Sequence, residues 1–319
     1  MIPLTSKNFD AIIADTDVCV KRLARYAKIG LAMGKREYPI KHWSYSSLIA
    51  YLRNPLAWHK RYVEGVYDMP ATPAGVVGRA GHTALQHFYG GIAKEGAIEL
   101  GLEYLQNIPD FEINFGKAVS ALARKKKRRR MEREYHQAIS FYLARPPRHK
   151  VLGVEVKALA HIPGIPIPVK AISDLVIVSR TDAAAVDIVD HKFVDFFGKT
   201  DLPRRLPAGQ AGQAGTDNPL FMLQALFNYY TVLSEFQKPV RRFIVYECKK
   251  KKNRDGKSQL RRHFIDFRKH EEEFTLFHRL LADATEDIRT RTMFLPNPSD
   301  MFEGKNSLDI YRLESDVDI

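Results

Sequence analysis

The chain has 319 residues, 45% of them hydrophobic, and a formal net charge of +13 at pH 7. This is enough apolar material for a substantial core, and the length is near the upper limit for one domain. Cys19 and Cys248 are the two cysteines, which excludes a disulfide scaffold and a four-cysteine metal or cluster site. The basic charge favours an anionic partner, with nucleic acid ahead of a membrane surface.

The sequence shows no signal for export or membrane insertion. The N-terminus has no basic region followed by an apolar run, so no secretory signal is expected. No segment approaches the ~18 successive apolar residues of a membrane span. We therefore expect a soluble protein of a reducing compartment, the cytoplasm.

The first predicted element is a helical N-terminal arm over residues 1–43. Apolar residues recur among charges over residues 8–33, a spacing that indicates a helix. Gly34 and Pro39 follow and close that segment.

Further helices are expected before residue 144. Ser44 or Ser46 can cap a helix that breaks at Asn54, because Pro55 follows it. The predicted helices cover residues 48–52, 56–63, 78–89 and 117–143.

The pattern then changes to strands. Three segments rich in Val and Ile, separated by turn residues, predict a three-strand meander over residues 150–161, 167–178 and 184–192. Next come a mobile Gly/Pro/Gln-rich loop at 206–219 and a helix at 221–236. Strands at 240–248 and 259–267 flank a hairpin turn at 253–256, and a helix at 271–290 precedes an irregular tail. This order predicts an α/β fold with a mixed central sheet flanked by helices.

Acidic residues stand at the ends of two of these strands. Asp190 and Lys192, with His191 between them, end one apolar run, and Asp174 stands at the head of another. Two carboxylates can hold a hard divalent cation, which polarises a phosphate and acidifies a water. A lysine can position that water and counter the developing charge. Taken alone the pattern is weak, because charged residues routinely end strands.

An ordered set of motifs strengthens this interpretation. Along the chain it comprises Ser44, Ser46 and Leu48; Asn54, Pro55 and Trp58; Tyr62 and Val63; Gly78, His82, Leu85 and Gln86; Glu155; Asp174; Asp190 and Lys192; and Gln224 with Tyr229. This order resembles the PD-(D/E)XK nuclease superfamily, within it the RecB-like and Cas4-like exonuclease branch that has phage-encoded members. The resemblance spans about residues 44–300.

The resemblance implies a restriction-endonuclease-like core over residues 44–319, including the basic helix at 117–143 and the C-terminal helix and tail. In that family His82, Asp174 and Asp190 would hold Mg²⁺ or Mn²⁺. Glu155 would lie near the metal or position the water, Lys192 would activate or orient that water, and Gln224 would lie near the active site and DNA.

Each assignment has a structural alternative. His82 could be a core histidine, Glu155 an exposed strand acid, and Gln224 a polar residue on an apolar helix face. Tyr229, expected at the DNA, stands one residue further from Gln224 than in many relatives, so Asn228 could take its place. His191 should point to the opposite sheet face and is not included in the site.

The sequence departs from the cluster-bearing members of that family. Asn54 stands where they have a cysteine, and the tail at 294–298 carries no cysteine. No iron–sulfur cluster is therefore expected. Gln86 replaces a glutamate, which puts a secondary helix contact in doubt.

Two runs of cations are candidate DNA contacts. Seven successive cations would wrap around the predicted long helix, and a second run lies near the hairpin tip; both could grip phosphates without reading bases. The alternative is a solvated, charged face. The runs are Arg124, Lys125, Lys126, Lys127, Arg128, Arg129 and Arg130, and Lys249, Lys250, Lys251 and Lys252.

Together these features predict a metal-dependent deoxyribonuclease, an exonuclease rather than an endonuclease, acting on single- or double-stranded DNA ends in recombination, repair or end-processing. A recombination or single-strand annealing protein would be a fitting partner, and no membrane is involved. The alternatives are a catalytically silent nucleic-acid-binding protein on the same fold and a basic scaffold or packaging protein. An intact set of two acids and a lysine argues against a silent relative, because clustered like charges are costly to keep.

Overall fold

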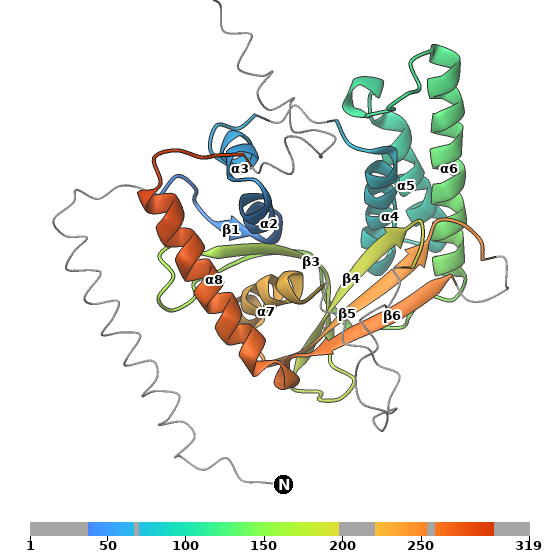
Figure 1. The fold of residues 1–319 in the computed structure, drawn as a ribbon. Helices are drawn as coiled ribbons and strands as arrows, with labels where there is room; N and C mark the ends of the chain where they lie inside the picture. Colours follow the sequence, from blue (N-terminus) through green and yellow to red (C-terminus); the bar gives the residue numbers. More distant parts are fainter. Residues whose placement is uncertain (1–37, 67–69, 198–220, 254–258, 297–319) are drawn as a thin grey trace, which may run out of the picture. The chain divides into compact units, whose positions relative to one another are not determined.

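The computed structural model describes residues 38–66, 70–197, 221–253 and 259–296, which form two compact units (Figure 1). Unit 1 comprises residues 38–65, 161–169 and 276–296, and unit 2 comprises the remaining described residues. The predicted helix at 8–33, the loop at 206–219, most of the hairpin turn and the tail beyond 296 lie outside the described residues.

Unit 1 begins with a short strand and two capped helices. β1 (Trp43–Ser44) leads into α2 (Tyr45–Arg53), and the Ser44 hydroxyl accepts a hydrogen bond from the Ser47 backbone N–H. Asn54 ends α2 and caps α3 (Pro55–Tyr62), because its side chain accepts from the Ala57 N–H at 3.0 Å. Pro55 occupies the first turn, where a missing N–H costs nothing. The predicted break at Asn54 is confirmed, and the motif residues here act as helix caps.

An aromatic cluster forms the core of unit 1. The rings of Trp43 and Trp58 stack at 5.7 Å, and Tyr51 meets Trp58 edge-on at 5.1 Å. The Trp43 indole N–H donates to the Thr285 hydroxyl at 2.9 Å. Thr285 lies on α8 (Glu271–Thr290), so the cluster fastens the predicted C-terminal helix to β1 and α2.

Unit 2 is built on a mixed sheet. β2 (Val151–Ala160) pairs with β3 (Val169–Val178), and β3 is antiparallel to β4 (Val186–Val194). β4 is parallel to β5 (Val240–Lys249), which is antiparallel to β6 (Leu260–Asp266). The predicted meander, the later strand pair and the mixed central sheet are confirmed.

Helices pack on both faces of this sheet (Figure 1). α4 (Pro73–Tyr89), α5 (Lys94–Asn107) and α6 (Ala121–Ala144) pack together and share one core with residues of β3, β4 and β5. The 3₁₀ turn η1 (Asp110–Glu112) follows α5 along the chain, and the 3₁₀ turn η3 (Phe267–Lys269) follows β6. α7 (Met222–Phe236) contacts β2, β4 and β5. α5 is a helix that the sequence interpretation missed.

Side chains alternate across β4, and this assigns the two faces. Val189 belongs to the core shared with α4, α5 and α6. Asp190 is one residue on, faces the other way, and meets Gln224 of α7. The predicted acid and lysine of β4 therefore lie on the α7 face. No helix in the described part of the chain is long and apolar enough to cross a bilayer.

Candidate active site

Asp190 is the centre of a buried polar cluster. Asp190 is 6% exposed, and Lys192 Nζ lies 3.0 Å from its Oδ1 and 2.8 Å from its Oδ2. The Gln224 side-chain amide donates to Oδ1 at 2.8 Å. The structure thus brings together three of the predicted site residues, and Gln224 has the partner that a polar group on an apolar helix face needs.

The environment of Asp190 opposes its charge. Burial raises the pKa of this carboxyl, and the nearby Asp174 carboxylate raises it further, while Lys192 acts against both. The other oxygen, Oδ2, is buried and lies close to the Lys192 ammonium, but it accepts no well-aligned hydrogen bond from the described residues. Such an oxygen is suited to face a cation.

The environment of Asp174, by contrast, favours its charged form. Its Oδ2 accepts the His191 backbone N–H at 2.7 Å and lies 3.2 Å from His82 Nδ1. Burial alone would raise the pKa of Asp174, but His82 and the bonds from His191 outweigh it and hold this pKa well below its usual range. Burial lowers the pKa of His82, but the neighbouring Asp174 carboxylate raises it by more, so the pKa of His82 lies above its ordinary value.

Glu155 reaches the same place through an unusual backbone conformation. Within β2 it has φ = 49°, the left-handed region that non-glycine residues rarely adopt in a strand. Such strain costs on the order of 1–3 kcal/mol and is concentrated at functional sites. Burial raises the pKa of Glu155, with Asp174 adding to the shift.

Three of these side chains form a group that fits a divalent metal. One ligand atom each from His82, Glu155 and Asp174 lie within 4.8 Å of one another. Two carboxylate oxygens and one imidazole nitrogen suit Mn²⁺ or a related divalent ion, and carboxylate oxygen suits Mg²⁺. The grouping contains Glu155, whereas the predicted ligand set had Asp190 in its place; Asp190 as a metal ligand stays a prediction.

The position of His82 depends on the glycine before it. A Cβ built on Gly81 would lie 2.3 Å from the Phe193 ring, so α4 can approach β4 this closely only because Gly81 has no side chain. The His82 ring then lies edge-on to Phe193, 6.0 Å between centroids. Gly81, which the predicted motif did not specify, therefore sets the distance between His82 and the strand acids, whereas the motif glycine Gly78 has open space around it.

His191, which the sequence interpretation left out, contacts Asp174 through both its ring and its backbone. Its ring packs on the other face as predicted, where it stacks with Tyr89 and Tyr246 and its Nε2 lies 2.9 Å from the Tyr142 hydroxyl, but its Nδ1 is 3.3 Å from Asp174 Oδ2. Its backbone N–H also bonds Asp174. A backbone donor carries no residue-type signal, so the sequence could not have indicated this backbone bond.

The two candidates that follow Gln224 are now separated. Asn228 is buried; it accepts from the Ser173 hydroxyl at 2.6 Å and donates to the Gln224 carbonyl at 2.9 Å. Tyr229 packs against Phe267 and Phe274 at 4.8 and 4.7 Å between centroids. Asn228 therefore ties α7 to the strand that carries Asp174, whereas Tyr229 belongs to an aromatic cluster.

The basic run on α6 is divided between surface and structure. Arg124, Lys125, Lys126, Arg129 and Arg130 are exposed. Arg128 instead donates to the carbonyls of Leu105 and Ile108 and to the Asp110 carboxylate, and Lys127 donates to the Phe115 carbonyl at 2.6 Å. Lys127 and Arg128 therefore bond the carbonyls at the end of α5 and in the turn after it, and their contact with DNA stays a prediction.

The second basic run is also divided between exposed and buried lysines. Lys250, expected at the DNA, is 1% exposed and pairs with Asp195 at 3.2 Å. Lys249 is half-buried, bonds the Asn253 side chain and lies over the Phe197 ring. Lys251 and Lys252 are exposed, and Lys251 is 3.8 Å from Glu134. The buried Lys250 contributes to the local fold at the end of β5.

Comparisons with known proteins agree with this geometry. The family model described as the PD-(D/E)XK nuclease superfamily matches residues 42–300. Among solved structures, the fold is similar to that of a "putative exonuclease" from Eubacterium rectale, with a TM-score of 0.50 and 8% identity over 83% of this chain and 88% of that chain. At this identity the likeness concerns the fold. No curated protein matches the sequence.

Proposed function

The chain belongs to the PD-(D/E)XK nuclease superfamily, and we propose that it is a divalent-metal-dependent deoxyribonuclease, with exonuclease rather than endonuclease activity. The observation that carries this proposal is the convergence of Asp174, Asp190 and Lys192 at one point of the sheet, with Gln224 bonded to the same cluster. The named structural neighbour and the basic charge of the chain support it.

The proposed division of labour follows from the contacts. His82, Glu155 and Asp174 would hold Mg²⁺ or Mn²⁺, with Asp190 beside them. A bound divalent cation would supply Lewis acidity, polarising the phosphate and acidifying a water. Lys192 lies 30% exposed against Asp190, so its ammonium can reach a water or phosphate oxygen without leaving its ion pair. Gln224 keeps the Asp190 carboxylate oriented.

The biological setting is also part of the proposal. A basic exonuclease of this superfamily would act on single- or double-stranded DNA ends in recombination, repair or end-processing. It would do so in the cytoplasm, beside a single-strand annealing or recombination protein. A RecB-like, Cas4-like lineage of phage origin fits the order of the motifs and the absence of cysteine at Asn54.

One panel of substrates tests this function. The purified chain would be incubated with Mg²⁺, with Mn²⁺ or with EDTA on circular and linear duplexes and on single strands blocked at either end. We expect metal-dependent loss of linear DNA only, and the blocked substrates then give the polarity. Cleavage of covalently closed circles at the same rate would instead establish an endonuclease.

An Asp190→Asn variant separates the enzyme from the silent binding protein. It should bind DNA with unchanged affinity, because affinity comes mainly from phosphate contacts to cations elsewhere, and should not cut. If the wild-type chain binds DNA but cuts no substrate under any metal, the silent alternative is correct.

A further inference from the structure

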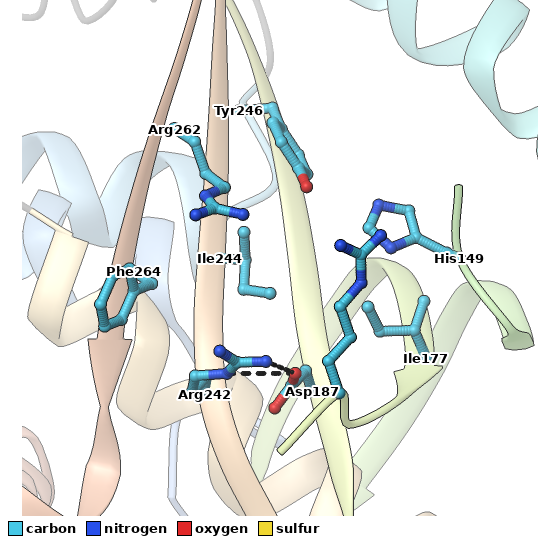
Figure 2. Close-up of a pocket in the computed structure, with 9 residues that line it drawn as sticks. His149, Ile177, Asp187, Arg242, Ile244, Tyr246, Arg262 and Phe264 are labelled. Carbon is cyan, nitrogen blue, oxygen red and sulfur yellow. Dashed lines mark hydrogen bonds and ion pairs between the residues drawn. The ribbon is translucent and has the colours of Figure 1, made fainter. Parts of the chain in front are cut away.

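A small polar cavity lies in unit 2 (Figure 2). It borders the face of the sheet opposite Asp190 and Lys192. Its volume is about 30 Å³, room for about two waters or one small tetrahedral anion. A nucleobase would not fit. The lining residues are His149, Ile177, Arg180, Asp187, Arg242, Ile244, Tyr246, Arg262 and Phe264.

The alternation of β4 explains why this cavity is separate from the active site. Asp187 stands three residues before Asp190, so the two carboxylates point to opposite faces of the sheet. Ile177, Ile244 and Tyr246 belong to the core shared with α4, α5 and α6, so the cavity borders that core. None of its residues contributes to the candidate active site.

A buried ion pair forms the floor of the cavity. Asp187 and Arg242 are register partners on β4 and β5, and Arg242 donates from Nε at 3.2 Å and Nη2 at 2.6 Å to Asp187 Oδ2 (Figure 2). Asp187 is 0% exposed, yet its Oδ1 has no hydrogen-bond partner among the described residues. A buried carboxylate oxygen without a donor is costly, and because Asp187 lines the cavity this oxygen is an unused acceptor at its wall.

The remaining polar groups are mostly donors. Arg180 and Arg262 are exposed residues at the cavity, and the ring nitrogens of His149 are buried without a partner in the described part of the chain. Burial, with Arg180 adding, lowers the pKa of His149 to about 4, so the ring is neutral at pH 7 and has one N–H to donate. Three guanidiniums and one carboxylate then give the cavity a net charge of +2.

The guanidiniums of Arg180, Arg242 and Arg262 all influence one group, the Tyr246 hydroxyl. Burial raises the pKa of Tyr246, and Arg262, Arg180 and Arg242 each act to lower it, Arg262 also through a hydrogen bond. Their positive fields therefore overlap at the Tyr246 hydroxyl. An anion placed in the cavity would be stabilised by all three.

We propose that this cavity is a second, non-catalytic site that binds a phosphate group end-on. Arg180, Arg242 and Arg262 would donate to its oxygens, since guanidinium geometry matches phosphate. Asp187 Oδ1 would accept the hydrogen of a protonated phosphate oxygen. Sulfate carries no such hydrogen near neutral pH, so Asp187 would repel it.

The small volume restricts how a phosphate can enter. A backbone phosphodiester has a sugar on both sides, which a cavity of this size cannot admit. A terminal phosphate or a free phosphate ion can enter past the exposed Arg180 and Arg262. The two sources that share this chemistry are inorganic phosphate and the terminal phosphate of a nucleotide or nucleic-acid strand.

Calorimetric titration of the full chain in EDTA tests the proposal without involving metal-dependent cleavage. The titrants are inorganic phosphate, sulfate, thymidine 5′-monophosphate, and one oligonucleotide with and without a 5′-phosphate. We expect phosphate or the monophosphate to bind with Kd on the order of 1 mM or tighter. Inorganic phosphate should bind at least about tenfold tighter than sulfate, and the strongest phosphate-bearing titrant identifies the source.

Matched variants assign the binding to the cavity. The Arg180→Gln/Arg262→Gln double variant should weaken binding at least about tenfold and, because both residues are exposed, should still fold. The control is Arg133→Gln/Arg279→Gln, which removes the same charge from exposed positions outside the cavity. No binding by any phosphate-bearing titrant, equal losses in both double variants, or equal affinity for sulfate would each overturn the proposal. A failure of nuclease activity would leave these titrations unaffected.

Discussion

Asp174 and Asp190 lie in one site but should affect stability in opposite directions. The pKa of Asp174 is held well below its usual range, so its charge stabilises the folded state. The pKa of Asp190 is raised by burial, so its charge opposes folding at pH 7. We therefore predict that Asp174→Asn destabilises the metal-free protein and that Asp190→Asn does not.

The contacts set the size of the effect. Asn at position 174 can still accept the His191 N–H but loses the charge that strengthens this bond and attracts His82. A hydrogen bond to a charged group contributes about 1.5–3 kcal/mol and a neutral one about 0.5–1.5, so the loss is about 1–2 kcal/mol. At ~2.1 cal/mol/K of unfolding entropy per residue, this loss lowers Tm by roughly 1.5–3 °C.

For Asp190→Asn the two main terms oppose each other. The substitution removes a buried charge that the folded state disfavours, but also the ion pair with Lys192. Lys192 is 30% exposed and can be solvated after the loss. The expected Tm is equal to or above that of the wild type.

Thermal denaturation by circular dichroism in EDTA at pH 7 measures both variants. The stabilisation by Asp174 is present above the ordinary Asp pKa of ~3.9 and is lost as pH falls below it. The gap between wild type and Asp174→Asn should therefore narrow on acidification. A larger loss of Tm in Asp190→Asn than in Asp174→Asn would refute this electrostatic account.

Three further predictions concern the surroundings of the site. Gly81→Ala should lower the free energy of unfolding by about 1–3 kcal/mol, because its Cβ would clash with Phe193 between α4 and β4. Gly78→Ala should raise the free energy of unfolding by about 0.5–1 kcal/mol, because this helical glycine has open space around it. Urea denaturation compares the two variants. Burial raises the pKa of Cys248 to about 12, so with the other cysteine replaced by serine the native protein should not react with Ellman's reagent at pH 8 until urea unfolds it; rapid labelling of the native protein would contradict the buried position. Arg128→Gln should lose about 1–3 kcal/mol, because two carbonyls and a carboxylate lose their donor, while Arg129→Gln should stay within about 0.5; equal unfolding midpoints in urea would show that Arg128 is not structural.

The strands and helices with a clear hydrophobic period could be predicted from the sequence. The meander, the strands β5 and β6 and helices α7 and α8 are where Val/Ile runs or helical spacing indicated them. α5 was missed, although Ala97, Gly101 and Leu105 recur every four residues and form its buried face. Glycines dilute the hydrophobic signal there, yet Gly101 is needed because Tyr135 and Ala80 approach it closely.

The site was predictable only in part. The strand-end acids and Lys192 converge as expected, because alternation and strand pairing fix their face. The left-handed backbone at Glu155 and the backbone bond from His191 to Asp174 have no signature in residue type. Charge alone also did not show that Arg128 and Lys250 use their cations on carbonyl and carboxylate groups of the fold itself.

The central claim, that Lys192 and the neighbouring acids form a phosphodiester-cleaving site, is tested most directly by one comparison of rates. Lys192→Met and Lys238→Met would be assayed beside the wild type on linear duplex DNA with Mg²⁺. Lys238 is exposed and lies outside the cluster, so its loss controls for charge. We predict metal-dependent cleavage by the wild type and Lys238→Met, and a fall of at least ~100-fold in Lys192→Met with its fold intact. Cleavage by Lys192→Met at the wild-type rate would contradict the account.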